Sequence, residues 1–182
     1  MNVAIVGSGP SAFYAAQAFT KLDKNVKIDI FEKLPAPFGL VRYGVAPDHQ
    51  KTKNIIKLFA NVLSNENVNL YCDIEIGKDI KIDFLSNAYD AILLASGAEL
   101  DRKLGIPGEN SSAVFSSTEF VGWYNGNPFF KNLCVPEQAK NIVIIGNGNV
   151  ALDCARLLAK HNEEFYGSDI MQSSKDLINK LN

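Results

Sequence analysis

The chain has 182 residues, of which 47% are apolar and 21% are charged, a composition typical of a soluble globular protein with a sizeable core. Lys and Arg number 18 against 20 Asp and Glu, so no global excess of positive charge favours binding to nucleic acid or anionic lipid. No uninterrupted apolar run approaches the roughly 20 residues that a membrane span requires. We therefore expect neither stable membrane insertion nor a nucleic-acid partner.

The cysteines Cys72, Cys134 and Cys154 are odd in number and widely spaced, and no C-x-x-C pair occurs. This pattern fits neither a disulfide framework nor a zinc cluster. We expect reduced thiols and no metal site.

The first elements in chain order predict a βαβ unit with a parallel pair of strands. Residues 2–6 form a short apolar strand that enters a glycine-rich turn, and residues 10–22 follow with helical apolar spacing at Phe13, Ala16 and Phe19. Residues 26–31 form a second apolar strand. Strand, turn, helix and strand in this order are typical of an α/β fold with a parallel sheet.

A Pro- and Gly-rich loop over residues 34–47 comes next, and its length suggests a functional loop. The apolar spacing of residues 51–64 predicts a helix with one buried face, which carries Ile55, Ile56, Phe59, Val62 and Leu63. Residues 68–72 and 73–76 are predicted as short strands, and residues 89–95 as a buried strand.

A second strand, turn and helix begins near residue 141. Residues 141–145 are an apolar strand by pattern, residues 150–160 a helix, and a last helix capped by Ser168 or Asp169 runs to the C-terminus. A doubly wound sheet needs several strands to bury both faces, and one strand is predicted here. We therefore expect a Rossmann-like α/β protein with a dinucleotide-binding domain over residues 1–139 and the start of a second over residues 140–182.

The first glycine-rich turn is a dinucleotide fingerprint of the form GxGxxA, made by Gly7, Gly9, Pro10, Ser11 and Ala12 with Ser8 between the glycines. Gly7 permits the tight turn, Gly9 lets the backbone approach a pyrophosphate at the helix N-terminus, and Ala12 packs where the third glycine stands. Glu32 ends the next strand, where an acidic side chain accepts hydrogen bonds from an adenosine ribose. The alternative for Glu32 is a solvated charge at a strand end.

The second turn consists of Gly146, Asn147, Gly148, Asn149 and Val150, again between a predicted strand and helix. Two fingerprints in one chain suggest two dinucleotides, which a flavoprotein that exchanges hydride between FAD and a nicotinamide requires. The alternative is a tight turn in an unrelated Rossmann domain.

Several segments together resemble the adrenodoxin-reductase type of ferredoxin–NADP reductase. They are VGSGP at residues 6–10, PFGLVRYGVAPDH at 37–49, IPGE at 106–109, FVGWYNG at 120–126 and GNGNVALD at 146–153. The resemblance implies FAD in the first domain, with Ser11, Glu32, Leu40 and Ile76 at matching positions, and NADP(H) phosphates at residues 146–150. It further implies electron transfer from NADPH through FAD to a ferredoxin- or adrenodoxin-type iron–sulfur protein, and a mitochondrial location, although no presequence is visible.

Members of that family continue with another strand of the NADP domain, an Arg pair that reads the 2′-phosphate, and a segment that returns to cover the flavin. The sequence contains none of these, which leads us to expect impaired activity. Two alternatives remain open: a non-catalytic FAD-binding module, and a flavin subunit that serves another acceptor, as in glutamate-synthase-like proteins.

Asp48 and His49 lie in a loop next to Pro47, between the two glycine-rich fingerprints. A His at this place is a candidate to orient the nicotinamide or influence proton flow near the flavin, and its alternative is a helix cap or surface residue. Trp123 and Tyr124 either wall a cofactor cleft or are ordinary core aromatics.

Overall fold

The computed structural model describes residues 1–98 and 101–181, which form two compact units. The first unit comprises Met1–Arg42 and Lys51–Ala98. The second comprises Tyr43–Gln50 and the described residues that follow position 100. These units are defined by internal contacts, so the predicted boundary between cofactor domains at residues 139 and 140 stays a prediction.

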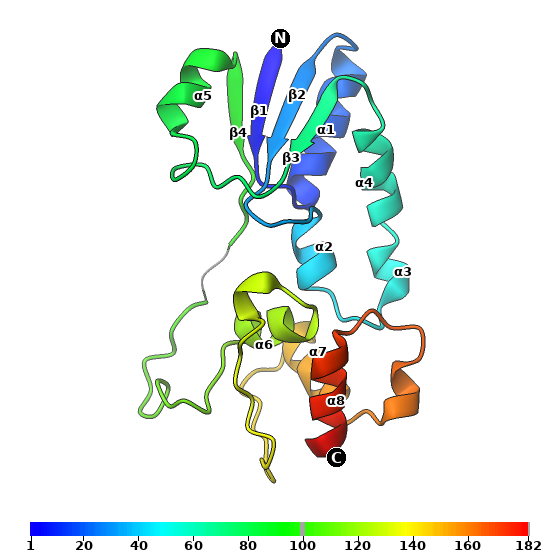
Figure 1. Ribbon diagram of the computed structural model, residues 1–182, viewed down its shortest axis with the longest axis vertical. Helices are drawn as coiled ribbons and strands as arrows, with labels where there is room; N and C mark the ends of the chain where they lie inside the picture. Colours follow the sequence, from blue (N-terminus) through cyan, green and yellow to red (C-terminus); the bar gives the residue numbers. More distant parts are fainter. Residues whose placement is uncertain (99–100, 182) are drawn as a thin grey trace. The chain divides into compact units, whose positions relative to one another are not determined.

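The first unit is built on a parallel four-stranded sheet of β1 (Asn2–Val6), β2 (Lys27–Phe31), β3 (Val68–Tyr71) and β4 (Ala91–Leu94), in the order β3-β2-β1-β4 (Figure 1). In the central strand, Val3 lies opposite both Ile28 and Ala91. The predicted βαβ unit and the α/β fold class are confirmed.

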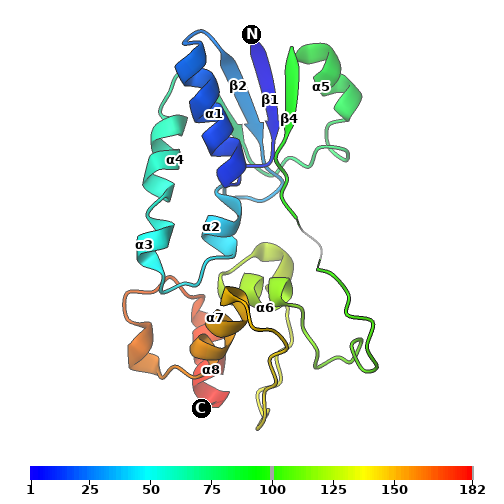
Figure 2. The same cartoon turned by 180° about the vertical axis from the view of Figure 1, so that it is seen from behind.

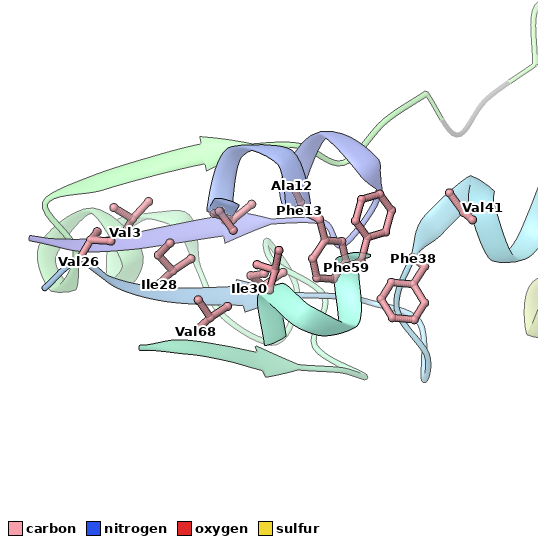
Figure 3. Close-up of a cluster of buried hydrophobic side chains, with 13 residues drawn as sticks. Val3, Ala12, Phe13, Val26, Ile28, Ile30, Phe38, Val41, Phe59 and Val68 are labelled. Atoms are coloured by element: carbon pink, nitrogen blue, oxygen red, sulfur yellow. The ribbon is translucent and has the colours of Figure 1, made fainter. Parts of the chain in front are cut away.

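Helices cover both faces of this sheet. On one face lie α1 (Pro10–Leu22) and α4 (Ile56–Leu63), and on the other lies α5 (Ile82–Ala88), as Figures 1 and 2 show. The face under α1 and α4 is the larger core, in which Phe13 stacks on Phe59 with ring centroids 4.9 Å apart (Figure 3). The opposite face is closed by Leu85 of α5 against Ala4 and Phe31. Aliphatic side chains thus point to both sides of the strands, as a covered parallel sheet requires.

Three sequence-based expectations differ from the structure in this unit. The predicted helix over residues 51–64 is divided into α3 (Gln50–Lys53) and α4, because i→i+3 hydrogen bonds, such as that from the Ile55 amide to Thr52 O, replace the regular pattern between them. Residues 73–76 are not a strand, since Asp73 has a φ of 58° that turns the chain out of the extended conformation. The predicted loop over residues 34–47 contains the short helix α2 (Gly39–Tyr43).

The second unit contains α6 (Ser117–Tyr124), the 3₁₀ turns η1 (Pro128–Phe130) and η2 (Asn162–Phe165), α7 (Asn149–Leu158) and α8 (Gln172–Leu181). A capping box begins α6, in which the Ser116 hydroxyl accepts from the Glu119 amide and the Glu119 carboxylate accepts from the Ser116 amide. The core of the unit joins these helices through buried side chains of Ala46, Val121, Trp123, Tyr124, Cys154, Leu157, Phe165 and Ile178.

Two expectations for this unit are wrong. Residues 141–145 form no strand: no described segment pairs with them, and Val143 and Ile145 are 83% and 70% exposed. A strand needs a neighbour to satisfy its backbone groups, and the apolar pattern alone does not supply one. The last helix begins at Gln172 and not after a cap at Ser168 or Asp169, because the Ser168 hydroxyl donates backward to Phe165 O. The expected end of that helix at residue 182 lies outside the described residues.

Candidate functional site

The first glycine-rich turn connects β1 to α1 and has the backbone geometry of a nucleotide-binding turn. Gly7 has a φ of 101°, and a Cβ atom there would lie 2.4 Å from Ala95 O of the strand end beside it. Both constraints exclude a side chain at position 7. The Gly7 amide also donates to Phe31 O at 2.7 Å, which fixes the turn to the end of β2.

Gly9 caps the N-terminus of α1 and leaves an open approach to it. A Cβ atom at position 9 would have nothing within 4 Å, and Gly9 has an ordinary φ of −78°. Pro10 occupies the first helical turn, Ser11 is exposed, and Ala12 is fully buried in the packing role expected of it. An open helix N-terminus, where the helix dipole has its positive end, has the chemistry to receive a phosphate group.

The segment after β2 packs directly on this turn. A Cβ atom on Gly39 would lie 2.9 Å from the Gly9 Cα, so the two glycine backbones are in close contact. Phe38 holds them there: its amide donates to Ser8 O at 2.9 Å, its ring is buried in the core, and its φ of 89° is rare for a residue with a side chain. Leu40, next in the chain, is 66% exposed.

Glu32 is buried beside the same turn, which excludes the alternative of a solvated strand-end charge. The residue is 6% exposed, and its carboxylate accepts hydrogen bonds from the Ser8 amide at 3.0 Å, the Ser8 hydroxyl, and the Leu34 amide at 2.9 Å. These donors hold the negative charge at the end of β2. Ile76 is partly buried on the opposite face of the sheet, in the cluster of Ala4 and Leu85.

The second glycine-rich turn precedes α7. Gly146 has a φ of 145°, Gly148 is the N-cap, and a Cβ atom on Gly148 would have nothing within 4 Å. Residues 146–150, which include Asn147, Asn149 and Val150, are all exposed. The turn thus resembles the first in its open helix N-terminus and differs in having no strand before it.

Asp48 is the centre of an ion-pair network in the second unit. Arg156 of α7 donates to both of its carboxylate oxygens, with a distance of 2.9 Å from Nη2 to Oδ1, and Lys160 donates to Oδ2 at 2.6 Å. Burial alone would raise the pKa of Asp48, but the hydrogen bonds and charges of Arg156 and Lys160 hold it well below its usual range. Asp48 therefore stays ionised and is engaged by two cations.

His49 lies beside this network. Its Nε2 is 3.2 Å from Arg156 Nη2 and 3.8 Å from Asp153 Oδ1, and its side chain is about half exposed. Arg156 Nη2 carries two hydrogens and faces three acceptors, which are Asp48, Asp153 and His49. The structure thus brings the two candidate residues together with α7, the helix that the second glycine turn begins.

Trp123 and Tyr124 are core aromatics, and the alternative of a cleft wall is wrong. They are 7% and 1% exposed, and both pack on Phe120 within α6. Burial raises the pKa of the Tyr124 hydroxyl, with the nearby Cys154 and Asp153 as further causes.

Sequence reasoning missed three polar residues of these sites, namely Ser8, Arg156 and Lys160. Asp153 and Arg156 lie one turn apart in α7, and Lys160 follows just beyond its end, so the helical spacing of these three charged residues was a detectable signal. For Ser8 no sequence signal exists, because its position between the two glycines is variable in the fingerprint.

In the described residues, no helix is long and apolar enough to span a membrane, and no group of three His, Cys, Asp or Glu side chains is placed to hold a metal ion.

Two glycine-rich turns, each opening a helix, define a nucleotide-binding α/β protein. The sequence model of the pyridine nucleotide-disulphide oxidoreductase family matches residues 1–177, and the chain belongs to this family.

Curated relatives agree with the resemblance found from sequence. NADPH:adrenodoxin oxidoreductase of Salvelinus fontinalis is 43% identical over 97% of this chain and 36% of its own length. The probable ferredoxin/ferredoxin–NADP reductase of Mycobacterium bovis is 45% identical over 93% of this chain and 29% of its own length. The chain therefore spans about a third of the length of the curated relatives it matches.

Solved structures of the Mycobacterium tuberculosis oxidoreductase FprA are also similar. Their TM-score is 0.95 at 39% identity, with 98% of this chain and 40% of that chain covered, and one of them is a complex with NADPH. The predicted fold and the resemblance to this type of reductase are both confirmed.

Proposed function

We propose that this chain binds FAD through the first glycine-rich turn and Glu32, as part of a flavoprotein reductase that takes hydride from NADPH and passes electrons to a ferredoxin- or adrenodoxin-type iron–sulfur protein. The observation that carries the proposal is the open N-terminus of α1 beside a buried, ionisable carboxylate. The relatives, an NADPH:adrenodoxin oxidoreductase and a probable ferredoxin–NADP reductase, support NADPH and the iron–sulfur protein as reaction partners.

The residues of the first turn fit the polar parts of FAD. The space beside Gly9, which a Cβ would fill, is available to a pyrophosphate, and the Ser11 amide and the positive end of the α1 dipole face this end of the helix. Glu32 provides an acceptor for a ribose hydroxyl, and Leu40 and Ile76 are proposed contacts by resemblance. A bound FAD supplies the redox chemistry, which is acceptance of a hydride and release of its two electrons one at a time.

We assign the second turn, residues 146–150, to the phosphates of NADP(H). Support comes from the exposed N-terminus of α7 and from the NADPH complex of FprA. Asp48 and His49 are proposed, by resemblance, to act near the reacting rings. Within their own unit, Arg156 and Lys160 keep Asp48 ionised and His49 adjoins Asp153. On this assignment, residues 1–139 serve FAD and residues 140–182 begin the NADP part.

A mitochondrial location is part of the same proposal. It is supported by the relatives from Salvelinus fontinalis and Bos taurus, which are named as mitochondrial, whereas the mycobacterial relatives show that the same type of chain also occurs in bacteria.

A second candidate function is a module that binds FAD without catalysing NADPH oxidation. The observation that favours it is the exposed segment of residues 141–145 in front of the second turn, which pairs with no strand among the described residues.

An absorption spectrum of the purified protein tests both. We expect a bound flavin that absorbs in the blue and loses this absorption when NADPH is added without oxygen. Flavin that stays oxidised with NADPH would favour the non-catalytic module, and protein that binds no flavin after incubation with FAD would contradict both functions.

A further inference from the structure

Ser8, between the two glycines of the first turn, is bonded through each of its polar atoms. It is fully buried. Its amide and its hydroxyl both donate to the same oxygen, Oε2 of Glu32, and its carbonyl accepts from the Phe38 amide. One residue thus connects the end of β1, the carboxylate at the end of β2 and the segment that packs on the turn.

These bonds leave the Glu32 carboxylate with little remaining capacity. A carboxylate has about four acceptor sites, two on each oxygen. Oε2 accepts two bonds from Ser8, and Oε1 accepts one from the Leu34 amide at 2.9 Å. One acceptor site remains, and it lies on Oε1.

We propose that Ser8 is a positioning residue for ribose recognition: its hydroxyl occupies Oε2 of Glu32, so that the carboxylate accepts one ribose hydroxyl, through Oε1. The inference rests on the proposed FAD site and adds how its carboxylate is used. A ribose offers two neighbouring hydroxyls, and Glu32 bonds one of them. Recognition of the adenosine ribose is therefore unequal between its 2′ and 3′ positions.

The hydroxyl of Ser8 is needed for this, because the Ser8 side chain is fully buried. An alanine at position 8 therefore leaves one acceptor site of Oε2 without a donor. The carboxylate is then held on this oxygen by one backbone bond, and it turns more freely. Ser8 acts on the ligand through Glu32, without contact to the ribose.

The test compares nucleotides that lack one hydroxyl. FAD is displaced from wild-type protein and from Ser8→Ala with ADP, 2′-deoxy-ADP or 3′-deoxy-ADP. The recovery of flavin fluorescence measures the displacement. For wild type we expect one deoxy nucleotide to bind about tenfold more weakly than ADP, because it loses one hydrogen bond to a charged group. The affinity of the other deoxy nucleotide should lie within about twofold of that of ADP. For Ser8→Ala, ADP binds more weakly and the difference between the two deoxy nucleotides shrinks, since the deletions act on one interaction.

A matched control is Ser64→Ala, which removes an exposed hydroxyl bonded to Asn61 O at the end of α4. It should leave all three affinities unchanged. If Ser8→Ala weakens the three nucleotides by the same factor, Ser8 acts on the fold or the pyrophosphate and the inference is wrong. Equal binding of both deoxy nucleotides to wild type also overturns it. Wild-type protein that binds neither FAD nor ADP contradicts the proposed function, and the inference with it.

Discussion

Arg156 binds both carboxylate oxygens of Asp48, although the two residues lie 108 positions apart in the chain. Asp48 lies in the segment Tyr43–Gln50 and Arg156 in α7, and the pair fastens that segment within the second unit. The Asp169 amide, which donates to Pro47 O at 3.0 Å, supports the same attachment.

Asp48→Asn is expected to destabilise the second unit. Asparagine lacks the negative charge to which two cations bond, so the free energy of unfolding should fall by about 1–3 kcal/mol. We expect the lower end of this range, because the Arg156 side chain is one third exposed. The measurement is the free energy of unfolding in urea. Asp176→Asn, on the exposed face of α8, is the control and should change stability little. Equal stability of the two variants would show that the ion pair contributes nothing net.

The same pair predicts a pH dependence. The pKa of Asp48 is lower in the folded protein than in the unfolded chain, where an Asp titrates near about 4. The contribution of Asp48 to the free energy of unfolding is therefore fully present above that pH. It is lost as the pH falls further toward the folded pKa. Wild-type stability should decline between about pH 5 and pH 3 more steeply than that of Asp48→Asn. Parallel curves over this range would contradict the assignment.

Gly9→Val and Gly7→Ala are expected to fail for different reasons. At Gly9 the folded chain has room for a side chain, which then stands where the pyrophosphate approaches, so FAD is lost and the fold is kept. At Gly7 even a methyl group collides with Ala95 O at a positive φ, so the fold itself suffers. Flavin content and thermal unfolding of the protein without FAD distinguish these outcomes. Wild-type flavin content in Gly9→Val would refute the role of Gly9.

Glu32→Gln should weaken FAD binding by roughly 1–3 kcal/mol through loss of a charged acceptor. The structure indicates that this substitution also lowers the stability of the folded protein. Both oxygens of Glu32 accept from donors in the chain, so the amide NH₂ of glutamine faces either Leu34 N or the donors of Ser8. Fluorescence titration with FAD and circular dichroism on heating measure the two effects. Unchanged affinity would remove Glu32 from the FAD site.

NADPH-dependent reduction of cytochrome through a ferredoxin is expected to be much faster when this chain is fused to the remaining segment of a relative. Residues 141–145 have no strand to pair with among the described residues, and the nicotinamide must be held closely for hydride transfer. Such positioning supplies several orders of magnitude in rate. FAD content of the two proteins is the control. Comparable turnover would mean that the second turn needs no such support.

The sequence predicted those elements whose local signals and tertiary packing agree. Apolar periodicity and a glycine-rich turn mark β1, α1 and β2, and α7 follows a glycine-rich turn in the same way. The helices α2, α5 and α6 were not predicted, because they are short or begin in Gly- or polar-rich segments where periodicity is weak. The strand at residues 141–145 was wrong for a different reason: an apolar run indicates a strand only when another strand is available to it.

The sites were predictable to a similar degree. Gly7, Gly9 and Glu32 follow from the fingerprint, and the structure places all three at one end of the sheet. Their support from Ser8 and Phe38 depends on three-dimensional contacts that no spacing records. The same holds for the link between Asp48 and α7.

The chain passes between its two units three times, after Arg42, after Gln50 and near Ala98. Neither unit is therefore a continuous piece of polypeptide, and a fragment that ends at residue 98 exposes Tyr43–Gln50 without the helices that hold it. During synthesis Asp48 leaves the ribosome about 5–20 s before Arg156, at usual elongation rates. For that time Asp48 lacks the arginine that binds it, and until the helices of the second unit follow, the buried faces of Tyr43 and Ala46 are open to chaperones or to other chains.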